Sequence, residues 1–339
     1  MRTSMQTRTR MIHRVLAVAV LLSAVAGREA CSGETCGEPD VWVASTRHLG
    51  GTCHTPTESP LAIERLAAPD NGCRRWERSD LATLLGEPHK PLLIFIHGNR
   101  YDSASAKQQG VLLARRLAAC CPHSPPVRTV IFSWPSQKQG CLLGDGRTKY
   151  RRCYTDAHYL ASLVGRIEPT RPLAILGYSF GALITLEALE DLCDAQRHGM
   201  LRGMHSCRHR PGGTRVVLVA AAVRCDALAP RGPYRQAMEC FDTLTLINNS
   251  RDDALRFFPL LDRSLDLPAL GYVGMPRRWV PPEIEYRAFD AAGIVGREHG
   301  LRLYLESNTL SRRIAEGTVG CLPEGPLAAS QSGGTPGRG

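Results

Sequence analysis

The chain has 339 residues, of which 43% are hydrophobic and 22% are charged, a balance typical of a globular protein with a sizeable core. The length suits one α/β domain with insertions. The formal net charge of the chain is +10. Four arginines near the N-terminus, Arg2, Arg8, Arg10 and Arg14, contribute +4, which leaves +6 for the rest of the chain. No basic stripe interleaved with aromatic residues appears, so nucleic-acid binding is not expected.

Residues 1–26 are predicted to be an export signal. Basic residues precede the apolar run Val15–Ala26, which is short for a bilayer span, and Ala24-Val25-Ala26 has the small-x-small form of a cleavage site. Translation could start at Met1 or at Met11. We therefore expect an extracytoplasmic location: secreted, periplasmic or in the cell envelope.

Two alternatives to a cleaved signal stay open. An uncleaved signal would associate the chain with a membrane. Lipid attachment at Cys31 is the other alternative, although Arg28-Glu29-Ala30 before it form a poor lipobox.

All 13 cysteines follow Ala26, and export makes disulfides possible. An odd number leaves at least one thiol free or paired between chains, and the pattern of pairing stays open. Cys141 and Cys153 flank a predicted polar loop. A basic stretch further on could hold a metal, but its spacing matches no zinc module, so a disulfide or a plain loop is favoured. Its residues are Cys193, His198, His205, Cys207 and His209.

Strands and helices alternate after a polar linker at 27–40. Strands are predicted at 41–47, 91–96, 127–133, 173–176, 215–223, 244–247 and 284–289, and helices at 111–119, 154–167, 182–192 and 301–311. This alternation predicts a mostly parallel sheet with helices on both faces, in one domain at 41–321. Residues 322–339 are rich in Pro, Gly and Ser and are predicted to form a disordered tail.

Two insertions interrupt this pattern. Residues 194–213 are basic and polar. Residues 256–283 carry many large apolar side chains, which predict either surface packing or a lid or acyl-pocket wall over the sheet edge.

The segment Gly177-Tyr178-Ser179-Phe180-Gly181 lies between a predicted strand and a predicted helix. In that context Gly-x-Ser-x-Gly predicts a nucleophile elbow, in which a sharp turn lifts the serine Oγ above the sheet. The flanking glycines remove side chains that would clash between strand and helix. Ser179 is therefore the candidate nucleophile, and the alternative is a glycine-rich turn without chemistry.

A serine hydroxyl needs a base, and the base needs an orienting acid. In enzymes with this elbow the chain order is Ser, then Asp or Glu, then His. His299, which follows the last predicted strand, is the candidate base. The acid stays open among Asp252 and Asp253 after the strand at 244–247 and Asp226 one strand earlier.

An oxyanion hole is expected from two backbone amides. One is that of Phe180, directly after the nucleophile, and the other is that of Asn99 in the loop after the strand at 91–96. His97 lies in the same loop and is expected to support it rather than to act as base.

Several motifs in order resemble the α/β-hydrolase superfamily, and within it a poorly characterised bacterial serine-hydrolase family. They are VWVASTR (41–47), FIHGNRYD (95–102), IFSWPS (131–136), GYSFG (177–181), Asp252-Asp253-Ala254-Leu255 and HGLRLYL (299–305). The resemblance covers about residues 41–311, implies an α/β-hydrolase fold and favours Asp252 as the acid. The family often has His before the serine, where this chain has Tyr178.

The expected function is that of an exported serine hydrolase without metal or organic cofactor, acting on a small-molecule or lipid acyl substrate, with a carboxylic ester as the default. Three alternatives remain: an amidase or peptidase with the same triad, a non-catalytic binding protein with this fold, and a basic envelope protein that binds acidic polymers. The substrate and the oligomeric state stay open.

Overall fold

A computed structural model of the chain describes residues 39–49, 61–67, 74–122, 124–201, 203–261 and 266–320. The predicted signal at 1–26, most of the linker at 27–40 and the predicted tail at 322–339 lie outside these residues. The same is true of the four most N-terminal cysteines, Cys31, Cys36, Cys53 and Cys73.

The described residues contain a nine-stranded sheet with the order β3-β2-β1-β5-β4-β6-β7-β8-β9. The strands are β1 Asp40–Ser45, β2 Ala62–Ala67, β3 Arg75–Ser79, β4 Leu92–Ile96, β5 Arg128–Ser133, β6 Leu173–Tyr178, β7 Thr214–Val219, β8 Thr243–Asn248 and β9 Glu285–Asp290. The seven strands β1, β5, β4, β6, β7, β8 and β9 pair in parallel with their neighbours in the sheet. β2 pairs antiparallel with β1, and β3 pairs antiparallel with β2 and forms one edge. The predicted fold class, a mostly parallel sheet with helices on both faces, is confirmed.

The central strands read as continuous apolar runs because both of their faces are covered. Every residue of β4, β5 and β6 is buried. In a parallel sheet with helices on both sides, neither face of a central strand meets water, so no polar alternation appears.

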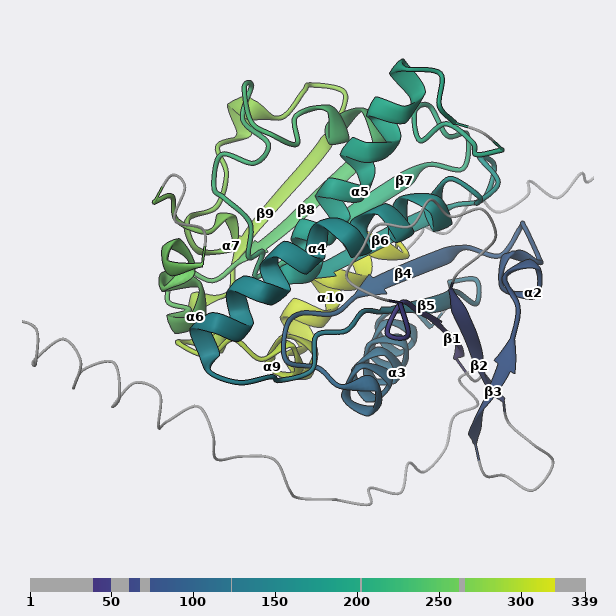
Figure 1. The fold of residues 1–339 in the computed structure, drawn as a ribbon, viewed down its shortest axis with the longest axis horizontal. Helices are drawn as coiled ribbons and strands as arrows, with labels where there is room; N and C mark the ends of the chain where they lie inside the picture. Colours follow the sequence, from purple (N-terminus) through teal and green to yellow (C-terminus); the bar gives the residue numbers. More distant parts are fainter. Residues whose placement is uncertain are drawn as a thin grey trace, which may run out of the picture. The chain divides into compact units, whose positions relative to one another are not determined.

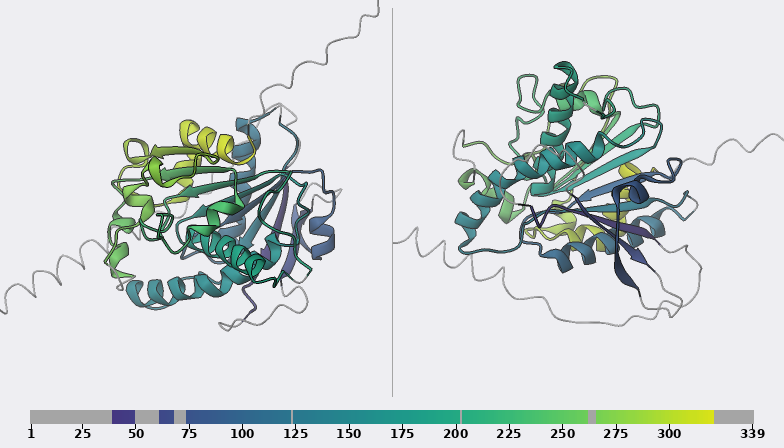
Figure 2. Two further views of the ribbon diagram at one scale, coloured as in Figure 1. Left: turned by 90° about the horizontal axis from the view of Figure 1, so that it is seen from above. Right: turned by 45° about the vertical axis from the view of Figure 1, so that its right-hand side comes forward.

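Two layers of helices cover the sheet (Figures 1 and 2). The longer helices are α3 Ser103–Cys120, α4 Leu142–Val164, α5 Phe180–Arg197 and α10 Asn308–Thr318, and the short ones are α2 Leu81–Leu85, α6 Asp253–Arg256, α7 Leu270–Val273, α8 Ala292–Val295 and α9 Leu301–Glu306. Helices α4 and α5 pack against each other on one face, while α3, α9 and α10 contact one another on the other face. No helix in the described part of the chain has both the length and the apolar character needed to cross a bilayer.

Helix α4 starts at Leu142, twelve residues before the predicted start at 154. The stretch between Cys141 and Cys153 is therefore helix and not a polar loop. Gly144, Gly146 and several charged residues gave this stretch the composition of a loop. Its packing is nevertheless that of a helix, since Tyr150 and Cys153 are both buried.

Other boundaries also differ from the sequence prediction, as for α3, which starts at Ser103 and not at 111, and two of the differences have a clear local cause. The helix predicted at 301–311 is divided at Ser307, whose hydroxyl accepts the Leu310 amide at 3.3 Å and so caps α10. The strand predicted at 215–223 ends at Val219, because Ala220 has a φ of 45° and turns the chain away from the sheet.

The apolar insertion at 256–283 is partly core and partly surface. Phe258 and Leu270 are buried, whereas Phe257, Leu260 and Val273 are about half exposed. The segment is joined to the chain after β7 by the Gly271 amide, which donates to the Ala221 carbonyl at 2.9 Å. It contains the 3-10 turns η2 Phe258–Leu260 and η3 Arg277–Trp279.

The basic insertion at 194–213 is attached to the neighbouring 3-10 turn η1, Gln236–Cys240, by a Cys207–Cys240 disulfide. The Cys193 Sγ lies 2.9 Å from the Cys240 Sγ and 3.7 Å from the Cys207 Sγ. The three sulfur atoms form a buried cluster in which the insertion's histidines take no part.

Candidate active site

Three loops meet at the edge of the sheet where the parallel strands end. Ser179 follows β6, Asp252 follows β8 and His299 follows β9. The His299 Nε2 lies 2.8 Å from the Ser179 Oγ, and its Nδ1 lies 2.6 Å from the Asp252 Oδ2. The structure therefore brings the three residues chosen from the sequence into one continuous chain of hydrogen bonds.

Ser179 occupies a strained turn between β6 and α5. Its φ of 55° and ψ of −119° lie outside the region that L-residues prefer. The turn is held by backbone bonds, because the Ser179 amide donates to the Val219 carbonyl of β7 and the Ser179 carbonyl accepts from Ala182 in α5 and from Ala222 after β7. This is the geometry of a nucleophile elbow.

The two glycines around the elbow are required by close packing. A Cβ on Gly177 would lie 2.7 Å from the Thr185 Oγ1, and one on Gly181 would lie 2.1 Å from the Ile96 carbonyl oxygen. The first contact lets strand and helix approach each other. The second brings the start of α5 against the end of β4, where the loop 97–101 begins.

Asp252 is the carboxylate that contacts the histidine. It is fully buried, and its Oδ1 accepts the Ala254 and Leu255 amides at the start of α6, which leaves Oδ2 directed at His299. The two other candidates are engaged elsewhere: Asp253 forms an ion pair with Arg297, and Asp226 forms one with Arg224.

The loop that carries His299 is tied to both the acid loop and the elbow. The buried Asn249 donates its side-chain amide to the Glu298 carbonyl at 3.2 Å, and the Asp253 amide donates to the Arg297 carbonyl at 3.0 Å. Tyr178, the residue before the nucleophile, donates its hydroxyl to the backbone carbonyl of His299. Neither Asn249 nor Tyr178 was assigned such a role from the sequence, because these contacts span about 50 and 121 residues.

The loop 97–101 lies directly against the nucleophile. A Cβ on Gly98 would come within 2.9 Å of the Ser179 Cβ and of the Tyr178 Cε1, so a side chain at this position would collide with the site. The backbone of the residues around Gly98 can therefore approach a group bound at Ser179. Asn99 follows in this loop, and Phe180 begins α5 on the other side of the serine.

Side chains just after β5 and β1 hold the loop 97–101 in place. The Trp134 indole donates to the His97 carbonyl at 2.8 Å, and the Ser136 hydroxyl donates to the Tyr101 carbonyl at 3.0 Å. Arg47, just after β1, donates to the Tyr101 carbonyl at 3.1 Å and also contacts the His97 Nε2 and the Ser133 hydroxyl. The motifs VWVASTR (41–47), FIHGNRYD (95–102) and IFSWPS (131–136) are distant in sequence but meet around the loop 97–101.

His97 is a neutral structural residue. Burial lowers the pKa of its imidazole to about 3. Because the Arg47 guanidinium can only donate, the His97 Nε2 must accept, which leaves the proton on Nδ1 for the bond to the Gly98 carbonyl at 2.9 Å. Its ring also stacks on Trp134.

The chain belongs to the alpha/beta hydrolase family, whose model matches residues 93–319. The match covers most of the described sheet and all of the loops that form the candidate site. It supports a hydrolase activity at the coarse level of the family. No curated protein sequence is significantly similar to this chain.

Several solved structures resemble the chain only remotely. Esterase B from Lactobacillus rhamnosis, in complex with an inhibitor, has 12% identity and a TM-score of 0.39, with 83% of this chain and 87% of that chain covered. A putative hydrolase from Agrobacterium vitis S4 has 15% identity and a TM-score of 0.37, with 75% and 91% covered. A lipase-esterase related protein from Clostridium acetobutylicum ATCC 824 has 12% identity and a TM-score of 0.34, with 68% and 93% covered. Similarity at this level is too low to support an inference about function.

Proposed function

We propose that this chain is an exported serine hydrolase that cleaves a carboxylic ester through a Ser179–His299–Asp252 triad. The observation that carries the proposal is the unbroken hydrogen-bond chain from the Ser179 Oγ through His299 to Asp252. The basic and apolar N-terminal sequence supports export.

In the first half of the reaction, the Ser179 Oγ attacks the acyl carbonyl while the His299 Nε2 takes its proton. Asp252 holds the proton of the imidazole on Nδ1 and stabilises the imidazolium that forms. The proton then passes to the leaving alcohol, whose C–O bond breaks, and an acyl-enzyme remains. In the second half, His299 removes a proton from water, which attacks the acyl carbon. The bond between that carbon and the Ser179 Oγ then breaks, His299 returns the proton to Oγ, and the acid is released.

The tetrahedral intermediate carries a negative charge on the former carbonyl oxygen. We assign the Phe180 and Asn99 amides to this charge, because α5 begins directly after Ser179 and the Gly98 backbone lies against it. One such donor contributes about 3 kcal/mol to transition-state stabilisation. The mechanism requires no metal or organic cofactor.

Amide or peptide hydrolysis by the same triad is the second candidate, because the three residues perform the same steps on an ester and on an amide, and the groups that recognise the leaving group lie elsewhere. A non-catalytic role is the third, and the shape of the triad argues against it. A binding protein has no need of a buried carboxylate held by two amides and aimed at a histidine.

A fluorescent organophosphonate, which reacts with activated serines, tests the proposal on the oxidised full-length protein. We expect one adduct, mapped by peptide mass to Ser179, that is lost in Ser179→Ala and falls at least a hundredfold in rate in His299→Ala. Asp253→Asn is a matched control for Asp252→Asn, and only the latter should slow labelling. Absence of labelling in folded protein would overturn the proposal in favour of a binding role.

A further inference from the structure

Three cysteine side chains meet where α5, the basic insertion 194–213 and the 3-10 turn η1 pack together. Cys193 lies near the end of α5, Cys207 lies in the insertion and Cys240 ends η1, and all three are buried. Cys207 and Cys240 form a disulfide, whereas Cys193 keeps a free thiol. We call these residues the three-cysteine cluster.

The free thiol lies in contact with the disulfide. The Cys193 Sγ is 2.9 Å from the Cys240 Sγ and 3.7 Å from the Cys207 Sγ, so Cys240 offers the nearer sulfur atom. A thiolate that reaches a disulfide sulfur can displace the other sulfur, which is the reaction of thiol–disulfide exchange. The cluster therefore holds all three sulfur atoms that this reaction needs.

Metal binding is the other reaction open to three neighbouring cysteines, and the bonding between them argues against it. Cysteine binds a metal as a free thiolate, and the disulfide takes up two of the three sulfur atoms. Within the described residues no histidine or carboxylate joins them as a further ligand. The cluster therefore suits sulfur exchange better than a metal ion.

Arg208, the residue after Cys207, places a positive charge beside the cluster. Burial raises the pKa of the Cys193 thiol, and a hydrogen bond from Arg208 together with its charge opposes that rise. The Arg208 Nε is buried and has no acceptor among the described residues. A thiolate in the cluster would accept from such a donor, so Arg208 can stabilise the sulfur anion that forms during exchange.

The two pairings restrain different parts of the chain. A Cys207–Cys240 bond ties the insertion to η1, whereas a Cys193–Cys240 bond would tie α5 to η1. In the second case only noncovalent contacts would hold the insertion. One of these is made by Arg210, whose guanidinium donates to the Ile167 carbonyl at 3.1 Å and to the Glu168 carbonyl at 2.7 Å.

We propose that the three-cysteine cluster is a thiol–disulfide exchange site, in which Cys193 displaces Cys207 from Cys240 and so releases the basic insertion from its covalent anchor. The Cys193 Sγ loses its proton and bonds to the Cys240 Sγ. The Cys207–Cys240 bond breaks, and the Cys207 Sγ leaves with the electron pair and takes up a proton. One disulfide and one thiol are present before and after, so the step needs no oxidant or reductant. The inference does not depend on the proposed hydrolase activity.

Trapping with N-ethylmaleimide, which alkylates free thiols, tests the exchange on the oxidised full-length protein at about pH 8 without reductant. Trypsin separates the three cysteines, because Arg197 and Arg235 lie between them, and mass spectrometry without reduction then identifies each alkylated cysteine and each linked pair. We expect label to accumulate on Cys207 with time while a Cys193–Cys240 link replaces the Cys207–Cys240 link. An unlabelled Cys207 with an unchanged Cys207–Cys240 link would overturn the inference, and so would a Cys193–Cys207 link with label on Cys240.

Two variants control this experiment. Cys193→Ser removes the attacking thiol, so the Cys207–Cys240 link should persist and Cys207 should stay unlabelled. Label on Cys207 in this variant would show that the disulfide opens by another route and would contradict the exchange. Cys225→Ser removes an unbridged cysteine outside the cluster and should leave the labelling of Cys207 unchanged.

The same variants allow each pairing to be examined alone. Cys193→Ser keeps Cys207–Cys240, and Cys207→Ser leaves Cys193 and Cys240 to pair with each other. We expect limited trypsin digestion to cut the insertion about tenfold faster in Cys207→Ser, because a segment without a covalent anchor opens more often. Equal rates would show that the exchange does not release the insertion. Absence of a Cys193–Cys240 link in Cys207→Ser would overturn the exchange itself.

Discussion

Tyr178, the residue before the nucleophile, also contacts the base, His299. Its buried ring lies 5.4 Å from the His299 imidazole, and its hydroxyl donates to the His299 carbonyl. The loop that carries His299 contains two glycines, Gly296 and Gly300, and the imidazole is a quarter exposed. The tyrosine therefore restrains the backbone from which the base projects.

We expect Tyr178→Phe to lower kcat about tenfold with little change in KM, because the lost bond orients a group that acts in the transition state and does not touch bound substrate. Steady-state kinetics on p-nitrophenyl acetate across the pH range measures this effect.

Tyr286→Phe provides the matched control, because it removes the same kind of bond, from a tyrosine hydroxyl to the Met275 carbonyl at 2.9 Å, on β9. A purely structural role for Tyr178 would give equal losses of thermal stability in the two variants, with kcat and KM unchanged in both.

The loop after β4 shows how strand ends assemble the site at the level of secondary structure. Arg47 after β1 and Trp134 and Ser136 after β5 hold the loop through its carbonyl groups. Because β1, β5, β4 and β6 are neighbours in parallel, their ends fall at one edge and their following residues meet there. The loop is thus positioned by the order of the strands.

Arg47→Lys is expected to lower kcat about tenfold, because a single ammonium cannot reproduce guanidinium bonds to the Tyr101 carbonyl, the Ser133 hydroxyl and the His97 ring. Stopped-flow measurement of acylation, with calorimetry to exclude unfolding, checks this. Arg65→Lys, on the neighbouring β2, serves as the control and should leave acylation unchanged. An Arg47→Lys protein with a lower melting temperature and full acylation would show that Arg47 stabilises the sheet and not the site.

The elements that the sequence predicted correctly are those whose pattern is imposed by burial. β4 and β6 are continuous apolar runs because helices cover both of their faces. β2 and β3 were not predicted, since they are short strands at one end of the sheet with exposed, charged residues such as Arg65 and Arg78.

The triad residues could be predicted from the sequence because the order of strands along the chain indicates which loops lie at the same edge of the sheet. Ser179, Asp252 and His299 each follow a parallel strand, and such loops converge at one edge whatever their separation in sequence. The family resemblance favoured Asp252 over Asp253, and the physical reason, the helix cap that orients the Asp252 carboxylate, is visible only in the structure. The contacts of Tyr178, Asn249 and Arg47 join segments that no local pattern connects.

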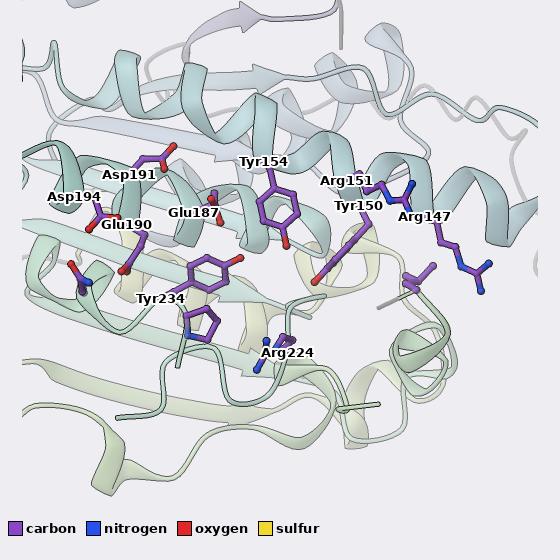
Figure 3. Close-up of a pocket in the computed structure, with 13 residues that line it drawn as sticks. Arg147, Tyr150, Arg151, Tyr154, Glu187, Glu190, Asp191, Asp194, Arg224 and Tyr234 are labelled. Carbon is purple, nitrogen blue, oxygen red and sulfur yellow. The ribbon is translucent and has the colours of Figure 1, made fainter. Parts of the chain in front are cut away.

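At the scale of the whole molecule, partly buried carboxylates of α5 make stability depend on pH. They are Glu187, Glu190 and Asp191, and they line a cavity between α4 and α5 (Figure 3). The folded-state pKa of Glu187, about 7, exceeds its unfolded value, so the folded state binds the extra proton and unfolding becomes easier as the pH rises from about 4 to about 7. The groups facing Glu187 are Tyr234, with Tyr154 bonded to it, and Asp191 and Asp194 on α5. Arg147, Arg151 and the Asp226-paired Arg224 line the same cavity.

We therefore expect Glu187→Gln, which keeps an acceptor for Tyr234, to raise the free energy of unfolding by on the order of 1 kcal/mol at about pH 8, after allowance for solvent screening. At about pH 4 the variant and the wild type should have equal stability, because Glu187 is then neutral in both states. Urea unfolding at the two pH values measures the difference. Glu283→Gln, on the surface, should alter neither value, and a pH-independent gain in Glu187→Gln would contradict the electrostatic origin.

The strained turn at Ser179 is imposed by its neighbours and not by its own side chain. Backbone groups of β7, of the chain after it and of α5 bind its amide and carbonyl. Gly177 and Gly181 fit against Thr185 and Ile96, so the serine oxygen contributes nothing to the path of the backbone. A chain with alanine at this position would keep the loops, the cavity and the His299–Asp252 pair, and would lack only the atom that reacts. Such a chain would bind its substrate without cleaving it. Immobilised on a support and exposed to a cell extract, it would retain the intact natural substrate, which mass spectrometry could then identify.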